Sequence, residues 1–120
     1  MAEAARWPVE DYQDDAGAKT RREPRLKLRS RVFFFGDDDF EGEGTLVDIS
    51  TRGCRVSTSI NVQTGMLLKL SLFLPDYNWP ARVDEAAVRW VQGQDFGLEF
   101  TSIQPAMRRR VLMLMIKPKP

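Results

Sequence analysis

The sequence predicts a mainly β domain of six short antiparallel strands, arranged as a barrel or a sandwich and followed by a short C-terminal α-helix. Three observations support this prediction. Apolar and polar residues alternate with period two over several segments, as in strands with one buried face. Turn residues separate these segments at roughly even spacing. The last segment begins at Pro105 and changes to the spacing of a helix.

The first predicted strand follows Pro24, because proline breaks any helix before it. One face of this strand is mostly apolar and the other mostly basic: Leu26, Leu28, Ser30, Val32 and Phe34 against Arg25, Lys27, Arg29, Arg31 and Phe33. The polar segment 36–42 is then expected to form a solvated hairpin turn. Its acidic residues do not have the spacing of an EF-hand calcium loop.

The other five strands follow from the same alternation, with glycines at the turns between them. Gly65 and the segment 92–95 are the clearest of these turns. We expect a second strand over 44–50, a third with Cys54, Val56, Thr58 and Ile60 inward, a fourth with Leu68, Leu70, Leu72 and Leu74 inward, a fifth over 81–91 with a bulge near Glu85, and a sixth with Phe96, Leu98 and Phe100 inward.

The C-terminal helix is expected to close the barrel with one apolar side. Its core-facing residues have helical spacing: Met107, Val111, Leu114 and Met115. Three successive arginines, residues 108–110, are expected to share the opposite side, and Pro118 and Pro120 to end the helix.

Composition bounds the function. A chain of 120 residues suits one domain, and a net charge of +1 gives no overall field for nucleic acid or membrane. The single cysteine, Cys54, excludes an internal disulfide and suggests a reducing, cytoplasmic location. The absence of histidine argues against a metal site and removes the usual general base. The apolar run 111–116 is too short to span a bilayer, and no signal peptide is visible.

One candidate binding segment lies at the end of the second strand. Asp48, Ser50 and Gly53 form an Asp-x-Ser-x-x-Gly pattern. Alternation is expected to place Asp48 and Ser50 on one exposed face, roughly 7 Å apart, with Val47 and Ile49 toward the core. Gly53 is expected to supply a backbone conformation that other residues resist. The alternative role for Asp48 is a surface ion pair with a nearby arginine, which can form without a ligand.

A second candidate segment precedes the first strand. Arg21 and Arg25 form an Arg-x-x-x-Arg pattern, and Asp48 follows Arg25 by 23 positions. Arg25 and Arg29 have the same spacing, but Arg29 belongs to the regular basic face of the strand. Arginine suits both phosphate and guanine, because its planar guanidinium can donate two parallel hydrogen bonds.

The two patterns together resemble the PilZ domain family of bacterial cyclic di-GMP receptors. Further similar features follow in order: Gly65, Leu74-Pro75, Val88-Arg89-Trp90, Phe96-Gly97-Leu98-Glu99-Phe100 and the closing helix. The resemblance covers about residues 21–116. Residues 1–20 are interpreted as a flexible N-terminal tail, with Trp7 and Tyr12 able to fold back onto the domain, and 117–120 as a C-terminal tail.

The resemblance implies a six-stranded antiparallel PilZ-type β-barrel that binds cyclic di-GMP on its outer surface and has no catalytic residues. The residues implied to bind the ligand are Arg21, Arg22, Arg25, Asp48, Ser50 and Gly53. Asp48 can accept hydrogen bonds from guanine N1–H and N2–H, with Ser50 beside it. Arg22 is expected to assist the other two arginines. No metal and no other cofactor are expected.

We expect a monomeric receptor that signals to an unidentified effector protein when ligand orders its N-terminal segment. The main alternative is a PilZ-fold protein-interaction module that does not bind cyclic di-GMP. A small barrel that binds nucleic acid through its basic face and Phe33 or Phe35 is a third hypothesis, against which the net charge of +1 argues. An enzyme is the least favoured, since no nucleophile–base pair is apparent.

Overall fold

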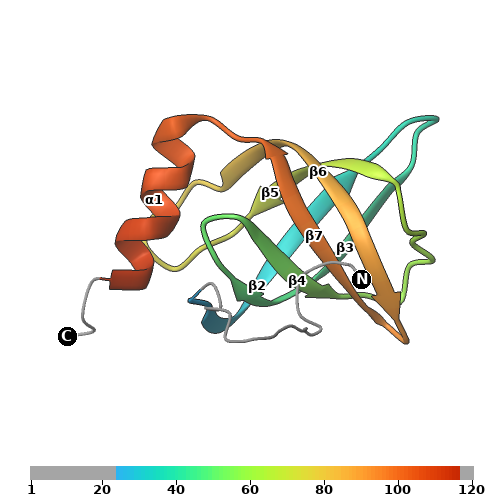
Figure 1. Ribbon diagram of the computed structural model, residues 1–120, viewed down its shortest axis with the longest axis horizontal. Coiled ribbons are helices and arrows are strands. Elements are labelled where there is room, and N and C mark those ends of the chain that lie inside the picture. Colours follow the sequence, from blue (N-terminus) through green and yellow to red (C-terminus); the bar gives the residue numbers. More distant parts are fainter. Residues whose placement is uncertain (1–23, 117–120) are drawn as a thin grey trace, which may run out of the picture.

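The structure, a computed structural model, describes residues 24–116, so the predictions for the two tails and for Arg21 and Arg22 lie outside it. Within residues 24–116 the chain forms six strands and one helix (Figure 1). These are β2 (Leu26–Phe35), β3 (Glu41–Ile49), β4 (Gly53–Ser57), β5 (Leu67–Leu72), β6 (Ala81–Gln92), β7 (Asp95–Ser102) and α1 (Pro105–Ile116).

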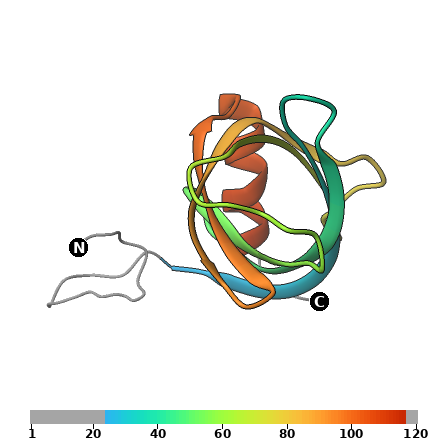
Figure 2. The same cartoon turned by 90° about the vertical axis from the view of Figure 1, so that its right-hand side faces the viewer.

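The strands close into one antiparallel barrel in the order β2-β3-β4-β7-β6-β5. Pairing of β2 with β5, from Val32 opposite Leu72 to Phe35 opposite Lys69, completes the ring. Of the two predicted arrangements, the barrel is therefore correct and the sandwich is wrong. Seen end-on, the strands form a ring around the interior and α1 lies across the far end (Figure 2).

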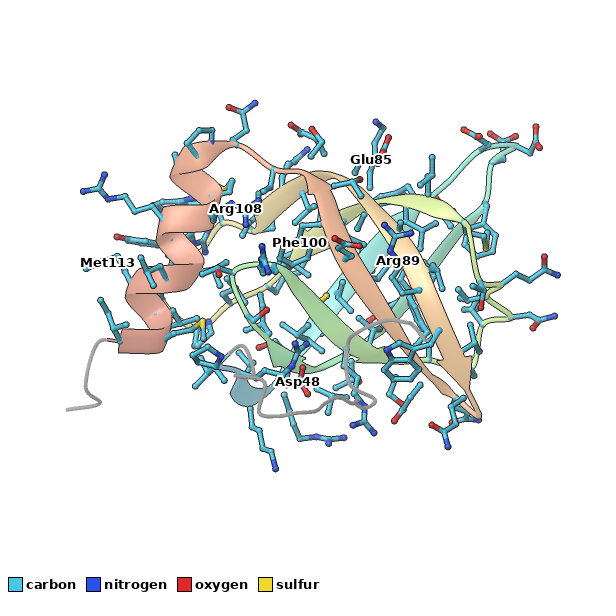
Figure 3. All side chains as sticks on the ribbon, in the orientation of Figure 1. Asp48, Glu85, Arg89, Phe100, Arg108 and Met113 are labelled. Atoms are coloured by element: carbon cyan, nitrogen blue, oxygen red, sulfur yellow. The ribbon has the colours of Figure 1, made fainter. Side chains whose placement is uncertain are left out.

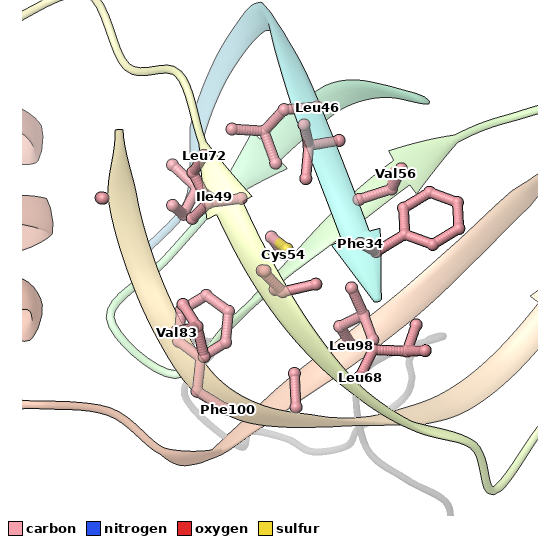
Figure 4. Close-up of a cluster of buried hydrophobic side chains, with 14 of the residues drawn as sticks. Phe34, Leu46, Ile49, Cys54, Val56, Leu68, Leu72, Val83, Leu98 and Phe100 are labelled. Carbon is pink, nitrogen blue, oxygen red and sulfur yellow. The ribbon is translucent and has the colours of Figure 1, made fainter. Parts of the chain in front are cut away.

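The core consists of the inward-facing residues of all six strands (Figure 4). Phe34 of β2 is fully buried and meets Phe96 of β7 edge to face, with ring centroids 5.5 Å apart. The predicted inward sets of β2, β5 and β7 are confirmed, as are Cys54 and Val56 of β4. Alternation predicts these positions well because each strand has one face in the core and one outside.

Three predictions about the strands are wrong in detail. The second strand, β3, begins at Glu41 and not at residue 44, so the hairpin turn is shorter than expected. Ile60 lies beyond β4, which ends at Ser57, and its side chain is exposed. A register shift between Leu46 and Asp48 lets Leu46 and Ile49 both point inward, while Val47 is only half-buried. The bulge expected near Glu85 is present.

The helix α1 packs against the barrel through the predicted residues, with Val111 buried and Met107, Leu114 and Met115 partly buried. The prediction for Arg110 is wrong, because its side chain is buried. Three successive residues cover more than half a turn of a helix and cannot all share one side. The helix α1 has 12 residues. Among the described residues, no helix is long and apolar enough to cross a membrane.

Candidate functional site

The predicted site begins with an ion pair between Arg25, just before β2, and Asp48 of β3. The Nε and Nη2 atoms of Arg25 lie 2.8 Å and 2.7 Å from the same oxygen, Oδ1 of Asp48. Both side chains are partly exposed, 27% for Arg25 and 13% for Asp48. Asp48 lies at the outer surface close to the start of β2 (Figure 3). The structure thus joins one arginine of the first motif to the aspartate of the second, 23 residues away.

Ser50 does not share the exposed face with Asp48, contrary to the prediction. Its side chain is fully buried and closes the turn between β3 and β4. The hydroxyl donates to the carbonyl oxygen of Gly53 at 3.3 Å and accepts from the backbone N–H groups of Arg52 at 3.1 Å and Gly53 at 3.2 Å. The alternation ends at Ile49 because the chain turns there, so the Ser50 side chain closes the turn and does not lie beside Asp48 on the outer face.

Gly53 is buried and pairs with Glu99 of β7 at the start of β4. Among the described glycines, positive φ angles occur at Gly65 and Gly93, so the expectation of an unusual backbone conformation at Gly53 is wrong. Hydrogen bonds from β7 and from α1 hold the turn that precedes Gly53. The backbone N–H of Phe100 donates to the Arg52 carbonyl oxygen at 2.8 Å, and Arg108 of α1 donates to the Thr51 carbonyl oxygen.

Asp48 belongs to a row of outward-facing positions that crosses five neighbouring strands. The register places Lys27 opposite Asp48, Asp48 opposite Arg55, Arg55 opposite Gly97 and Gly97 opposite Trp90. The row therefore reads cation, carboxylate, cation, glycine, aromatic ring. We call these five residues the outer row.

The far part of the outer row is held by an ion pair and by the indole ring. Arg55 donates to Oδ2 of Asp95 from Nε at 3.1 Å and from Nη2 at 2.5 Å, and its guanidinium carbon lies 5.9 Å from the Trp90 ring centroid. Trp90 lies directly over Gly97. A Cβ atom added to Gly97 would come within 2.1 Å of the Trp90 Nε1 atom, so only glycine leaves room for the ring.

The outer row offers three kinds of contact on one surface. Its carboxylate can accept from a donor edge, its cations can bind a phosphate, and its ring can stack on a base. Sequence reasoning placed Arg55 on the outside but did not connect it or Trp90 with the motif residues. The pairing that brings Trp90 and Gly97 beside Arg55 joins Arg55 to Gly97, 42 residues away in sequence, which no local pattern reveals.

The described residues offer little for catalysis. Cys54 is fully buried, and this burial raises the pKa of its thiol far above the usual range, so the reactive thiolate does not form near neutral pH. No cluster of three or more metal-ligating side chains occurs between residues 24 and 116.

Comparison with protein families gives a match to the PilZ domain over residues 19–117. A comparison with curated proteins gave no match. Solved structures that share the fold include those of MotI/DgrA, YcgR and CeSA. The inhibitor of motility MotI/DgrA of Bacillus subtilis has a TM-score of 0.69 and 21% identity, covering 83% of this chain and 51% of that one. This chain thus spans about half the length of MotI/DgrA.

The other two structures are PilZ domains themselves. The PilZ domain of YcgR from Escherichia coli, solved with cyclic di-GMP, has a TM-score of 0.63 and 13% identity, covering 81% of this chain and 89% of that one. The PilZ domain of CeSA from a cellulose-synthesizing bacterium has a TM-score of 0.59 and 15% identity, covering 77% and 94% respectively. At these identities the likeness is one of fold.

Proposed function

Since the chain belongs to the PilZ domain family, we propose that it is a non-catalytic, cytoplasmic and monomeric receptor for cyclic di-GMP. The observation that carries the proposal is the contact between Arg25 and Asp48, which brings the two motif segments together at one place on the outer surface. The cyclic di-GMP bound to the PilZ domain of YcgR supports the choice of ligand.

The proposed ligand contacts combine the outer row with the arginines ahead of β2. Asp48 accepts from the N1–H and N2–H groups of a guanine, while Arg25, Arg21 and Arg22 bind phosphate or the O6/N7 edge. Trp90 offers a ring face beside Arg55 for stacking. Ser50 and Gly53 act indirectly, because they fix the turn that follows Asp48.

In the proposed mechanism, ligand binding loosens the ion pair between Arg25 and Asp48. Asp48 can accept from both guanine N–H groups through its two oxygens only if Oδ1 loosens its contact with Arg25, and this partly exposed pair costs about 1 kcal/mol or less to break. Arg25 is then free to turn toward phosphate. Residues 21–25 become ordered on the barrel, and this ordering, which opposes binding energetically, is the signal offered to an effector protein.

Calorimetric titration of cyclic di-GMP into the full chain tests the proposal. We expect micromolar or tighter binding, no binding of GTP, and binding about 10- to 150-fold weaker in Arg25→Ala, which removes hydrogen bonds from a charged group. Arg29→Ala is the matched control, since this exposed arginine follows Arg25 at the same spacing as Arg21 precedes it. Its affinity should stay unchanged.

The alternative function is protein interaction by a PilZ fold that does not bind cyclic di-GMP. An exposed apolar surface on α1, described below, gives this alternative its support. No heat and no shift of the melting temperature with cyclic di-GMP would reject the receptor and favour the alternative. Equal weakening by Arg25→Ala and Arg29→Ala would reject the proposed site while leaving the receptor in place.

A further inference from the structure

The helix α1 is apolar on two sides, and only one of them packs on the barrel. The inner side is formed by Met107, Val111, Leu114 and Met115. A second set of residues, Arg109, Leu112, Met113 and Ile116, has the i, i+3, i+4, i+7 spacing of a single stripe and is exposed throughout. Met113 is 47% and Ile116 62% exposed. In Figure 3 Met113 lies on the side of α1 that faces away from the barrel.

Two exposed aromatic rings extend this stripe. Tyr77 and Trp79, in the loop between β5 and β6, stack on each other with centroids 4.5 Å apart, and more than half of each side chain is exposed. The Arg110 guanidinium carbon lies 5.1 Å from the Tyr77 centroid and 5.7 Å from that of Trp79. Met113 follows Arg110 by one helical turn. The rings and the stripe therefore form one surface, which we call the α1 face.

A buried cation lies beneath the α1 face. The Arg110 side chain is only 5% exposed; its Nε and Nη2 atoms bond to the Asp76 carboxylate at 2.9–3.3 Å, and Nη2 also bonds to the Trp79 carbonyl oxygen at 2.8 Å. The third nitrogen, Nη1, is buried with no acceptor from the described residues. The other bonds of Arg110 fix the loop that carries both aromatic rings against α1.

We propose that the α1 face is the docking site of the chain's own N-terminal segment, residues 1–18. The charges are complementary. Residues 1–18 contain five acidic residues and one arginine, whereas α1 has two exposed arginines, Arg108 and Arg109, has no acidic residue, and is followed by Lys117 and Lys119. The segment also brings Trp7, Pro8, Val9 and Tyr12, which suit an apolar face.

The geometry of the chain permits this docking. Leu26 pairs with Ile49, next to the turn whose Thr51 carbonyl oxygen accepts from Arg108 of α1. The described chain therefore begins at the end of the barrel that carries α1. A helix of 12 residues is roughly 18 Å long. Twenty-three residues reach up to about 75 Å when extended, so residues 1–18 can lie along the whole α1 face.

A spin label on the full chain tests the proposal. Cys54 is buried with its pKa raised, so a thiol-reactive label attaches selectively to a new cysteine in Ala5→Cys. Without ligand, we expect the label to remove more than half of the NMR intensity of the Met113 and Ile116 methyl groups and of the Trp79 indole N–H. The reference is Val91 of β6, which is exposed beside the turn where β7 begins, whereas α1 follows the other end of β7. The NMR signals of the Val91 methyl groups should keep their intensity.

Two controls decide how the result is interpreted. Adding Trp7→Ala and Tyr12→Ala, or Glu10→Gln and Asp11→Asn, should restore the lost intensity, and so should high salt in the labelled protein. Lack of any selective loss would overturn the proposal. Loss of intensity in an isotope-labelled copy mixed with a spin-labelled one would show that a second copy occupies the face instead, and would overturn it too.

Flotation with phosphatidylglycerol vesicles tests whether a membrane surface binds the α1 face instead. Recruitment of the full chain that depends on Met113 and Ile116 would assign the α1 face to a membrane surface and overturn the proposal, whereas no recruitment is expected. All of these measurements are made without cyclic di-GMP. The docking can therefore fail while the receptor function stands, or hold while that function fails.

Discussion

Asp48 has two sets of neighbours that come from different kinds of contact. Strand pairing places it between Lys27 and Arg55 in the outer row, and a side-chain ion pair joins it to Arg25. The first set is fixed by the backbone of the barrel. The second depends on a side chain ahead of β2, which can move without disturbing the barrel. We therefore expect the proposed ligand to replace Arg25 at Asp48 at little cost in stability.

Ser50 is expected to matter for stability more than for ligand contact. Ser50→Ala removes a buried hydroxyl that serves two N–H groups and one carbonyl of the turn, so we expect a loss of about 1–3 kcal/mol in the free energy of unfolding. Urea denaturation measures the loss. The exposed Ser59→Ala is the control and should change stability by less than about 0.5 kcal/mol. Equal effects of the two changes would contradict this role.

Cys54 is expected to make stability fall at alkaline pH. Burial raises its pKa in the folded protein, so the folded state stays protonated after the unfolded thiol, with a pKa near 8.5, has ionised. The unfolded state then binds fewer protons. The free energy of unfolding is unaffected by this thiol below about pH 8 and falls above it, by at most roughly 1.4 kcal/mol per pH unit.

Denaturation at pH 7 to 10 checks this expectation against Cys54→Ala. The variant should lose stability less steeply with rising pH, although its smaller side chain lowers stability at every pH. A thiol reagent should label the native protein slowly and the unfolded protein fully. Parallel pH profiles for the two proteins, or rapid labelling of the native thiol, would show that the thiol is accessible.

Hydrogen bonds from two arginines hold α1 at the end of the barrel. Arg108 bonds to the turn between β3 and β4, and Arg110 bonds to the loop between β5 and β6. The helix therefore ties together two connections that are far apart in sequence. One of them, the turn that Ser50 closes, follows Asp48 directly in the chain.

The contact of Arg110 with Asp76 is expected to stabilise the protein more than the contact of Arg108 with the turn. Arg110→Met should cost about 1–3 kcal/mol, because it removes the hydrogen bonds of a buried guanidinium to the more exposed Asp76 carboxylate and to the Trp79 carbonyl oxygen. The matched control is Arg109→Met, an exposed neighbour on the same helix, which should cost less than about 0.5 kcal/mol. Chemical denaturation measures both. Similar values for the two variants would contradict a structural role of Arg110.

The barrel as a whole acts as a rigid support for segments at its surface. Its six strands form a closed ring with no open sheet edge over the paired residues, and its core is apolar throughout. We therefore expect the proposed signal to be carried by segments at the surface of the barrel. The proposed ligand and the proposed docking of residues 1–18 both act on the chain ahead of β2.

Amide hydrogen exchange is expected to detect the proposed signal. Saturating cyclic di-GMP should slow exchange over residues 19–25, since ordering of this segment removes its amides from free contact with water. The polar turn at 36–40 is the internal control and should exchange at an unchanged rate. Unaltered exchange over 19–25 with ligand bound would separate binding from the proposed switch and contradict the latter.

Local pattern determined much of this molecule. The strands, the inward sets on β2, β5 and β7, the bulge near Glu85 and the start of the helix at Pro105 follow from alternation and turn residues, because each depends on neighbours in sequence. The family resemblance, carried by two motifs at a fixed separation, was confirmed by the match over residues 19–117.

Tertiary structure decided what depends on contacts between distant segments. Closure of β2 on β5 selected the barrel over the sandwich, and the β3 bulge overrode strict alternation at Val47. Ser50 turned inward because the chain reverses there, and Arg110 became buried because Asp76 is present to receive it. Strand register alone created the outer row from Lys27 to Trp90. A sequence encodes such contacts only through the whole fold, since no local interaction brings their partners together.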